Sequence, residues 1–443
     1  MAGGTGMSTA GDLEFVFEWE PAPAVRANEL RETWARLEVW AGSDCLTRVE
    51  DVQSRSARRS IYLSLYPLAE WLSYNWWFLK AHHRPASIPA EMWTYRHART
   101  QTWMRRHNFR AAGDGYSWPD VTVIPEGAHT RVAWRRDLMM QSLRPIRFLS
   151  EGETRIPSDV LERRLAEFVT AVLARLAEQG VTGTLLEKEW DDVQSMDDEE
   201  VEFCLASARL GLDPYMEDQS AEDAILLASE QLDGAILLDF FDAVDPSSIG
   251  NGLDWIKDAT VRVREFGTQN GQISSLRSAA GAIPGDYWPR PWQAGWEEAR
   301  HIRALLAADP QDPVELTGLV PTAVLDSRDH GLQGLGATAE SGSSLVLGRD
   351  MVRKAKRFCQ GRALWHTLFE QDAGRFLITS SHTERQKTER AFAAELLAPA
   401  EGIERQLGIA ADEATVEDLD DVAEHFGVSS LLIRHQVENQ LLV

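Results

Sequence analysis

Tryptophan is distributed unevenly along this 443-residue chain, and this limits how the chain can fold. Ten of the 16 tryptophans lie in the first 134 residues, at positions 19, 34, 40, 71, 76, 77, 93, 103, 118 and 134. The chain is also longer than one hydrophobic core usually organises, so several domains are expected. We therefore predict that the Trp-rich N-terminal part is a separate module.

The first part of the chain mixes strand-like and helix-like patterns. Strand-like segments bounded by polar residues, Pro or Gly lie at 13–19, 118–127 and 130–135. Between them, residues 67–80 repeat apolar side chains at helical spacing, and Pro67 suits the first turn of a helix. These patterns predict a flexible tail over residues 1–12 and a mixed α/β module over residues 13–150.

The middle of the chain, residues 151–280, is acidic and predicted to be mainly helical. Helical periodicity is clear at 157–180 and again at 221–232. Residues 187–202 hold nine acidic residues against one lysine but lack the glycine-broken spacing of an EF-hand, so we interpret them as a solvated face. The Pro- and Gly-rich segment 281–292 is the predicted boundary to the next module.

The last part of the chain, residues 290–443, alternates helices with short strands. The predicted order is one helix, three strands, two helices and a terminal helix pair. The corresponding segments are 294–307, 319–326, 332–339, 343–348, 351–370, a helix ending at Pro399, 416–426 and 429–439.

This order is similar to that of the ImmA/IrrE family of metallopeptidase-like proteins, and four segments carry the resemblance. FAAELLAP at 392–399 is the most specific of them. The others are ARHIRALLAADPQDPVELTGL at 299–319, SSLVLGRDMVRKAKRFCQGRALWHTLFE at 343–370 and VAEHFGVSSLLIRHQV at 422–437. The resemblance implies a zincin-like, gluzincin-type α/β domain at the C-terminal end of a multidomain chain.

Active members of that family hold zinc with an H-E-x-x-H sequence and a Glu on the next helix, the Glu between the histidines activating water. The resemblance places His366 and Glu370 at the two histidine positions, Thr367 at the general base and Gln386 at the third ligand. A threonine cannot take a proton from a metal-bound water, and a glutamine is a weak neutral ligand. We therefore expect a catalytically degenerate site, no hydrolysis by the family mechanism and no cofactor.

Two interpretations of this segment stay open. In the first, His366 pairs with Glu370 or with Arg362, and Glu389 is a solvated helix residue; we favour it because a His beside a Glu on one helix is a common pattern. In the second, His366, Glu370, Gln386 and Glu389 bind zinc or another divalent metal, and the protein is a divergent metal-dependent endopeptidase.

A basic and aromatic stretch at residues 80–136 offers a third hypothesis, a nucleic-acid or nucleotide sensor. It holds ten Lys or Arg against four acidic residues, a local charge of +6. Basic groups among aromatic rings suit single-stranded nucleic acid or a nucleotide. The candidate residues are Arg96, Arg99, Trp103, Arg105, Arg106 and Arg110. We favour the alternative, in which the arginines pair with acidic residues and the aromatic rings are core, because the whole chain has a net charge of −24.

Charge, cysteine spacing and apolar patterns limit the compartments and the classes of partner that fit this sequence. The charge of −24 argues against a general nucleic-acid coat or a binder of anionic membranes. Cys45, Cys204 and Cys359 are far apart and form no CxxC pair, the N-terminus lacks the pattern of a secretory signal, and the apolar stretch 67–79 is too short to span a membrane. We expect a cytoplasmic protein.

By resemblance, the expected role is that of a regulatory factor rather than a cutting enzyme. ImmA/IrrE proteins often act on or with transcriptional repressors in stress, phage or mobile-element settings. The resemblance thus implies a stress- or defence-related pseudopeptidase that binds a protein partner, for which a transcriptional regulator is the candidate.

Overall fold

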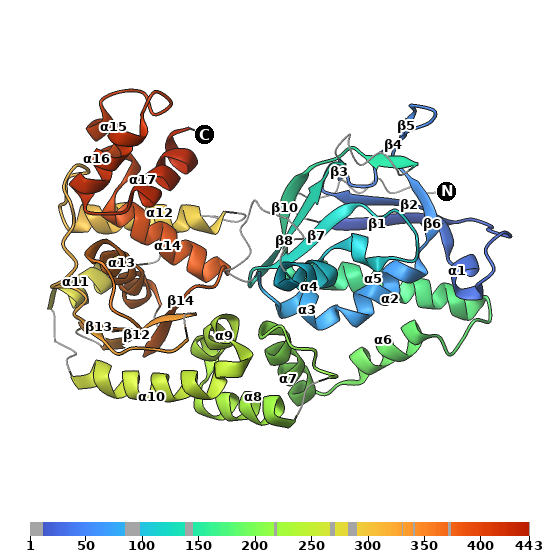
Figure 1. Cartoon of the computed structure of the whole chain (residues 1–443), viewed down its shortest axis with the longest axis horizontal. Coiled ribbons are helices and arrows are strands. Elements are labelled where there is room, and N and C mark those ends of the chain that lie inside the picture. Colours follow the sequence, from blue (N-terminus) through green and yellow to red (C-terminus); the bar gives the residue numbers. More distant parts are fainter. Residues whose placement is uncertain are drawn as a thin grey trace. The chain divides into compact units, whose positions relative to one another are not determined.

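The computed structural model describes residues 12–84, 98–137, 145–216, 219–265, 271–281, 290–329, 331–339, 342–370 and 374–442. The chain forms two compact units, residues 1–217 and 218–443 (Figure 1). Helices account for 53% of the structure and strands for 18%, arranged in several small sheets. The predicted mixed α/β class is therefore confirmed.

Unit 1 is built on antiparallel sheets covered by helices. One sheet has the order β1-β2-β3 with β6 also paired to β2, a second has the order β10-β8-β7, and a third β5-β4-β9. Its strands are β1 (Leu13–Trp19), β2 (Trp34–Ala41), β3 (Asp44–Cys45), β4 (Val49–Asp51), β5 (Ala57–Arg58), β6 (Ile61–Ser64), β7 (Asp120–Pro125), β8 (His129–Arg135), β9 (Ile146–Phe148) and β10 (Gly152–Pro157). Its helices are α1 (Asn28–Glu32), α2 (Tyr66–Tyr74), α3 (Trp76–Ala81), α4 (Ala98–His107), the short 3-10 helix η1 (Phe109–Ala112), α5 (Ser158–Glu178), α6 (Leu185–Ser195) and α7 (Asp198–Arg209).

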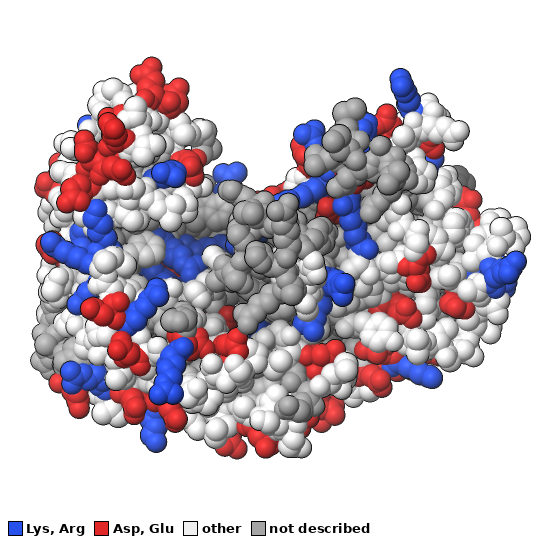
Figure 2. Space-filling view, viewed as in Figure 1, with Lys and Arg blue, Asp and Glu red and all other residues white. Residues whose placement is uncertain are grey.

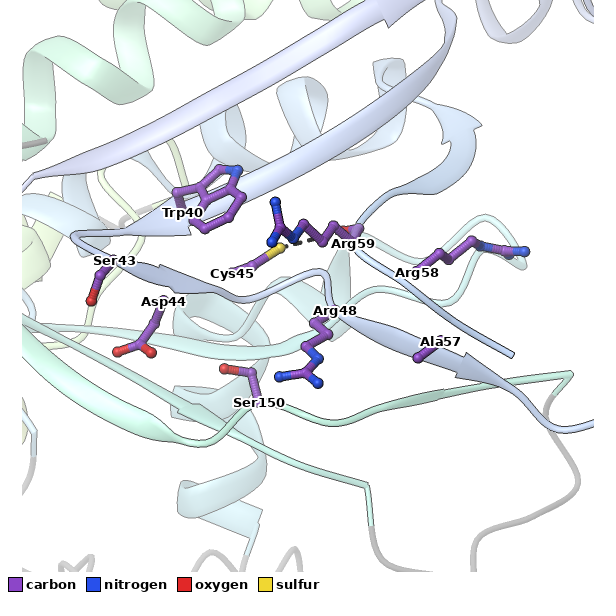
Figure 3. Close-up of a pocket in the computed structure, with 9 residues that line it drawn as sticks. All are labelled: Trp40, Ser43, Asp44, Cys45, Arg48, Ala57, Arg58, Arg59 and Ser150. Atoms are coloured by element: carbon purple, nitrogen blue, oxygen red, sulfur yellow. Dashed lines mark hydrogen bonds between the residues drawn. The ribbon is translucent and has the colours of Figure 1, made fainter. Parts of the chain in front are cut away.

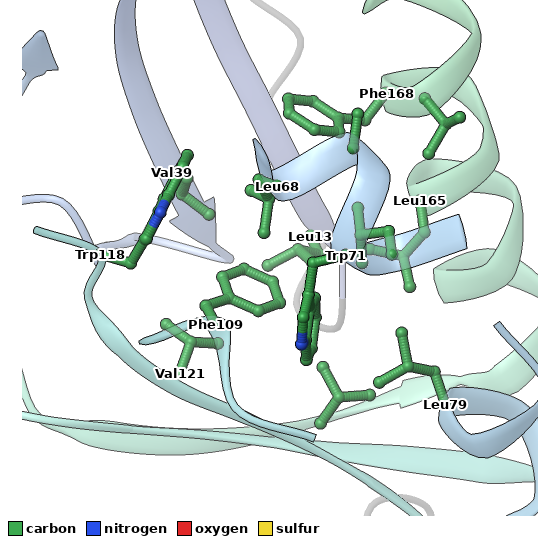
Figure 4. Close-up of a cluster of buried hydrophobic side chains, with 14 of the residues drawn as sticks. Leu13, Val39, Leu68, Trp71, Leu79, Phe109, Trp118, Val121, Leu165 and Phe168 are labelled. Atoms are coloured by element: carbon green, nitrogen blue, oxygen red, sulfur yellow. The ribbon is translucent and has the colours of Figure 1, made fainter. Parts of the chain in front are cut away.

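Aromatic side chains fill the core of unit 1, as the tryptophan distribution predicts. Trp71 of α2 meets Phe109 of η1 edge to face, with the ring centroids 5.8 Å apart (Figure 4). The buried tryptophans of this unit are Trp71, Trp76, Trp77, Trp103, Trp118, Trp134 and Trp190. The same core takes in Leu186 of α6 and Cys204 of α7. Helices from the predicted middle region therefore belong to unit 1.

Most predicted elements of unit 1 are observed, with one break. The strands predicted at 13–19, 118–127 and 130–135 correspond to β1, β7 and β8, and the helix predicted at 157–180 is α5. The single helix predicted at 67–80 is instead two, α2 and α3, separated at Asn75. The Asn75 backbone leaves the helical region, and its side-chain amide donates to the Trp71 carbonyl at 2.8 Å. Asparagine side chains compete with helical backbone bonds in this way.

Unit 2 contains one four-stranded mixed sheet surrounded by helices. The strand order is β11-β13-β12-β14, with β11 and β13 parallel and the other pairs antiparallel. Its strands are β11 (Thr322–Val324), β12 (Leu332–Ala339), β13 (Gly342–Leu347) and β14 (Arg375–Thr379). Its helices are α8 (Gln219–Gln231), α9 (Gly234–Ala243), η3 (Pro246–Ser248), α10 (Ile249–Glu265), α11 (Gly271–Ala280), α12 (Pro291–Leu305), α13 (Arg353–Phe369), α14 (Glu384–Leu397), α15 (Ala400–Leu407), α16 (Val416–Phe426), α17 (Ser430–Gln436) and the final turn η4 (Val437–Leu441).

Helix α13 packs on this sheet, and α14 packs between α13 and α12. A Cβ atom built on Gly295 of α12 would lie 2.3 Å from the carbonyl oxygen of Thr388 in α14, so only glycine allows the two helices to approach this closely. Every residue of α13 from Cys359 to Leu368 is buried. A helix buried on all sides is a core helix, and polar side chains on it need partners inside the protein.

Elements predicted in the last part of the chain are largely observed. The segments at 294–307, 332–339, 343–348, 351–370 and 416–426 correspond to α12, β12, β13, α13 and α16. Strand β14 and helix α15 were not predicted. The boundary between the units, at 217/218, differs from the predicted boundary at 281–292, because α11 contributes Ile273 and Leu276 to the core of unit 2.

Two features bear on function: whether a helix could cross a membrane, and where acidic side chains lie on the surface. Within the described residues, no helix is both long enough and apolar enough to cross a membrane. Acidic side chains gather over α15 and α16 on the face shown in Figure 2, where α16 carries Glu417 and Asp418 in its first turn. An acidic first turn stabilises a helix through its dipole but repels phosphate groups.

Candidate functional site

His366 lies near the C-terminal end of α13 and is almost completely buried, with 1% of its surface exposed. Its ring stacks on Phe376 of β14 with the centroids 4.5 Å apart, and Trp365 meets the ring edge to face. Aromatic contacts on this scale fix the orientation of the imidazole. The two ring nitrogens therefore point in directions set by the packing of α13 on the sheet.

Each nitrogen of His366 has a carboxylate partner. Nδ1 lies 2.8 Å from Oε2 of Glu370, one helical turn onward, and Nε2 is hydrogen-bonded to Oε2 of Glu389 on α14. Burial acts to lower the pKa of His366, but Glu389 and Glu370 together outweigh it and raise the pKa to about 9. The ring is therefore an imidazolium at neutral pH that donates from both nitrogens, and an imidazolium has no lone pair for a metal.

Glu389 forms a second buried ion pair, with Arg362 of α13. The Arg362 Nε donates to Oε1 of Glu389 at 2.9 Å, and Arg362 also donates to the Gln333 side chain at 2.8 Å and the Thr379 carbonyl at 2.7 Å. Burial acts to raise the pKa of Glu389, but Arg362 and His366 outweigh it and lower the pKa to about 2. Both oxygens of this carboxylate are thus occupied by cations.

Glu370 and Asp239 share a third cation, Arg385, at the start of α14. Arg385 donates to Glu370 Oε2 at 2.6 Å, donates to Glu370 Oε1 and also pairs with Asp239 of α9. The network therefore contains three cations, Arg362, His366 and Arg385, and three carboxylates, Glu370, Glu389 and Asp239. Buried charges arranged in such balance avoid the large penalty of an unpaired ion. We call these six residues the His366 network.

Gln386 and Thr367 have other roles. The Gln386 amide donates to Oδ1 of Asp239 at 2.6 Å, and its oxygen closes a capping box with Thr383 at the N-terminus of α14. The Thr367 hydroxyl donates to the Ala363 carbonyl at 2.9 Å and lies 2.8 Å from the Ser343 hydroxyl. Thr367 is fully buried, so it is a packing residue at the position where the resemblance to ImmA/IrrE proteins places the general base.

The donor set does not fit a resident metal. All four carboxylate oxygens of Glu370 and Glu389 accept hydrogen bonds from cations, and both imidazole nitrogens are used. Among the described residues, no group of three or more His, Cys, Asp or Glu is arranged to hold a metal ion. A metal would have to displace Arg362 and Arg385 and take a proton from His366.

Sequence reasoning placed part of this network. The favoured interpretation pairs His366 with Glu370 or with Arg362; the first pair is observed at 2.8 Å, whereas Arg362 pairs with Glu389. Its description of Glu389 as solvated was wrong, because Glu389 is fully buried between Arg362 and His366. It missed Arg385 and Asp239. Asp239 did leave a signal, since it is a lone acid within the apolar run ILLDFF and buried carboxylates need partners.

The basic stretch at 80–136 uses several of its candidate residues internally. Trp103 is buried and stacks on His107 at 4.2 Å, and Arg106 lies 3.7 Å from the centre of the Phe78 ring while donating to the Gly211 carbonyl at 2.7 Å. Arg110 pairs with Asp120 at 3.0 Å. The Arg105 side chain is exposed, while Arg96 and the Arg99 side chain lie outside the described part of the chain. The buried Trp103 and the Arg110–Asp120 pair agree with the interpretation of core rings and paired arginines.

Comparisons with known proteins add no family assignment. Neither a scan against protein-family models nor a search of curated proteins finds a match for this chain. The similarity to ImmA/IrrE proteins therefore stays a prediction from the residues quoted above.

Proposed function

We propose that unit 2 is a metallopeptidase-like scaffold in which the His366 network stands in place of a metal centre, and that the protein acts by binding a protein partner. The observation that carries this proposal is the pairing of every ligand-capable atom of His366, Glu370 and Glu389 with an opposite charge. A site that is neutralised internally lacks both the metal and the general base that peptide hydrolysis needs. A protein that cannot cut but keeps the scaffold can still recognise a protein chain.

The partner class follows from the resemblance and from surface charge. ImmA/IrrE-like proteins suggest a regulatory partner, such as a transcriptional regulator in a stress or defence response. The acidic surface over α15 and α16 favours a partner with a basic face, because opposite charges steer association. DNA itself is a poor ligand for that surface.

Metal analysis of the purified intact protein tests the loss of the metal centre. We expect zinc, manganese and iron well below one atom per chain after preparation in zinc-supplemented medium. His366→Ala is the informative variant, and His301→Ala, which changes a partly exposed histidine of α12, is its matched control. One tightly held zinc per chain that is lost in His366→Ala and kept in His301→Ala would overturn the proposal and favour the divergent endopeptidase.

An affinity pull-down with the intact protein tests the binding role. We expect a captured protein that stays uncut during incubation and whose capture weakens as salt is raised. Cleavage of the captured protein that depends on His366 would contradict the proposal. Binding of single-stranded nucleic acid that is abolished by Arg105→Glu would favour the sensor hypothesis for residues 80–136 instead.

A further inference from the structure

A cavity in unit 1 combines three arginines with a tryptophan. The cavity has a volume of about 430 Å³ and lies beside β3 and β5 (Figure 3). Its lining includes Trp40, Ser43, Asp44, Arg48, Arg58, Arg59 and Ser150. A volume of this size suits a small organic ligand, for which pockets of roughly 300–1,000 Å³ are usual.

The cavity is positively charged in a strongly acidic protein. Within the described residues, Arg48, Arg58 and Arg59 make no salt bridge to a carboxylate. Nearby arginines behave differently, since Arg147 pairs with Glu50 and Arg136 pairs with Glu151 at 3.0 Å. With 69 acidic residues in the chain, arginines that form no salt bridge around one cavity favour an external anion.

The guanidinium groups have the chemistry of phosphate recognition. Arginine presents a planar fork of donors that matches phosphate oxygens in pairs, and it keeps its charge at all physiological pH values. In Figure 3, Arg48 extends on the side of the cavity where Ser150 lies, whereas Arg59 extends beside Trp40. Arg58 extends away from both, and its Nε donates to the Ser60 carbonyl at 3.1 Å. Arg48 and Arg59 are therefore the main anion-binding groups.

The rest of the lining is suited to a ring and a sugar. Arg59 lies over the Trp40 ring at 5.7 Å from its centre, so the indole provides a planar surface for a base next to a guanidinium that can bind phosphate. Asp44 and Ser43 are exposed at the same cavity. A carboxylate there would repel a simple anion but can accept hydrogen bonds from ribose hydroxyls, as acidic residues do in dinucleotide sites.

From these features we infer that the cavity binds a small nucleotide, with its phosphates at Arg48 and Arg59 and its base at Trp40. A long polynucleotide is disfavoured because the remainder of the chain is strongly negative. The inference concerns unit 1 and is independent of the function proposed for unit 2.

Binding of four nucleoside diphosphates, ADP, GDP, CDP and UDP, to the intact protein by calorimetry tests the inference. At least one is expected to bind with a micromolar dissociation constant. Pyrophosphate and the matching nucleoside are partial ligands, because each makes only part of the contacts. Each is expected to bind with an affinity about tenfold or more below that of the diphosphate. Absence of binding by all four at millimolar concentration would overturn the inference.

Three variants locate the site, and one serves as a control. Arg48→Glu and Arg59→Glu are each expected to raise the dissociation constant of the nucleotide about tenfold or more. Trp40→Leu should lower the affinity for the nucleotide to the affinity measured for pyrophosphate. The affinity for pyrophosphate itself should stay unchanged. Arg26→Glu makes the same charge reversal on an exposed residue outside the cavity lining. It should leave the affinities for the nucleotide and for pyrophosphate unchanged.

The same measurements can also overturn the inference. Nucleotide binding that survives the double variant Arg48→Glu/Arg59→Glu places the ligand elsewhere. A single-stranded oligonucleotide that binds more tightly than any diphosphate, with a steep salt dependence, identifies a nucleic-acid groove instead. The substituted arginines are exposed, and circular dichroism of each variant checks that the fold is kept.

Discussion

Each unit of this protein buries histidine, and the two environments have opposite effects. In unit 2, His366 lies between Glu370 and Glu389, and its pKa rises to about 9. In unit 1, His107 is equally buried but bonds through Nδ1 to the Val123 carbonyl and through Nε2 to His82. Burial, against a smaller opposing effect of the Val123 carbonyl, lowers the pKa of His107 to about 3, and burial followed by the nearby His107 lowers that of His82.

The comparison shows that burial alone does not determine the charge of a histidine. Desolvation disfavours the imidazolium in both places, but only in unit 2 do neighbouring carboxylates compensate for it. His366 is thus one cation in a balanced ionic network, whereas His82 and His107 form a neutral pair linked by a 3.2 Å hydrogen bond. The first arrangement keeps a charged histidine in the protein interior, and the second keeps its histidines neutral.

Removing the central carboxylate of the His366 network should give the largest effect. Glu389→Gln keeps the shape of the side chain but leaves Arg362 and His366 buried without their shared anion. Breaking a buried ion pair typically costs about 3–5 kcal/mol. We expect the free energy of unfolding of unit 2, measured with urea, to fall by that amount.

The matched control for this change is Glu424→Gln on α16. Glu424 is exposed and pairs with Lys354 at 3.0 Å. Surface ion pairs contribute about 0–1 kcal/mol, so this variant should unfold almost like the native protein. Equal losses in the two variants would mean that the His366 network is not a buried ionic unit.

The two histidine environments should also respond to pH in opposite directions. The folded pKa of His366 lies above the unfolded value of about 6.5, so its contribution to stability is complete below pH 6.5 and is lost as pH rises through about 9. The folded pKa of His107 lies below the unfolded value, so its contribution is present above pH 6.5 and is lost as pH falls toward 3. The His366 contribution is on the order of 3 kcal/mol.

Urea unfolding from pH 6 to 10 tests the His366 part of this prediction, with His366→Gln as the comparison. The native protein should lose stability across that range relative to the variant. Nitrogen NMR of the imidazole rings at pH 7.5 gives a direct check, because His366 should be doubly protonated and His107 neutral. A neutral His366 signal at that pH would contradict the prediction that Glu370 and Glu389 keep His366 protonated.

A smaller effect is expected from the glycine that packs against the neutral pair. Gly211 has a φ of +73°, and a Cβ atom there would lie 3.0 Å from Nε2 of His82. Gly211→Ala should therefore destabilise unit 1 by about 1–2 kcal/mol, through the left-handed backbone and through the crowded ring.

Gly183→Ala is the control for Gly211→Ala. Gly183 has nearly the same φ, +71°, but a Cβ atom there would meet nothing within 4 Å. The control should lose about 1 kcal/mol from backbone strain alone. The difference between the two variants measures how tightly the His82–His107 pair is packed, and equal losses would show that this pair tolerates the extra methyl group.

Sequence patterns predicted much of the local structure because hydrophobic periodicity acts over neighbouring residues. The alternation at 13–19 corresponds to β1, and the spacing at 157–180 corresponds to α5. The same rule placed His366 and Glu370 on one face of a helix, one turn apart. The helix break at Asn75 was missed because it depends on a side-chain bond to the Trp71 carbonyl, which periodicity does not reveal.

Local patterns were thus enough to predict the mixed α/β class and an aromatic core in unit 1, and they gave the His366–Glu370 pair as one of two interpretations. The charge of His366 was beyond their reach, because it depends on Glu389, which is 23 positions away along the chain and buried with Arg362. The same holds for Asp239, which reaches Arg385 over 146 positions, and for the arginine-lined cavity, which gathers Trp40 and Ser150. Burial and electric fields are properties of packed neighbours in space, so these features arise only when distant segments come together.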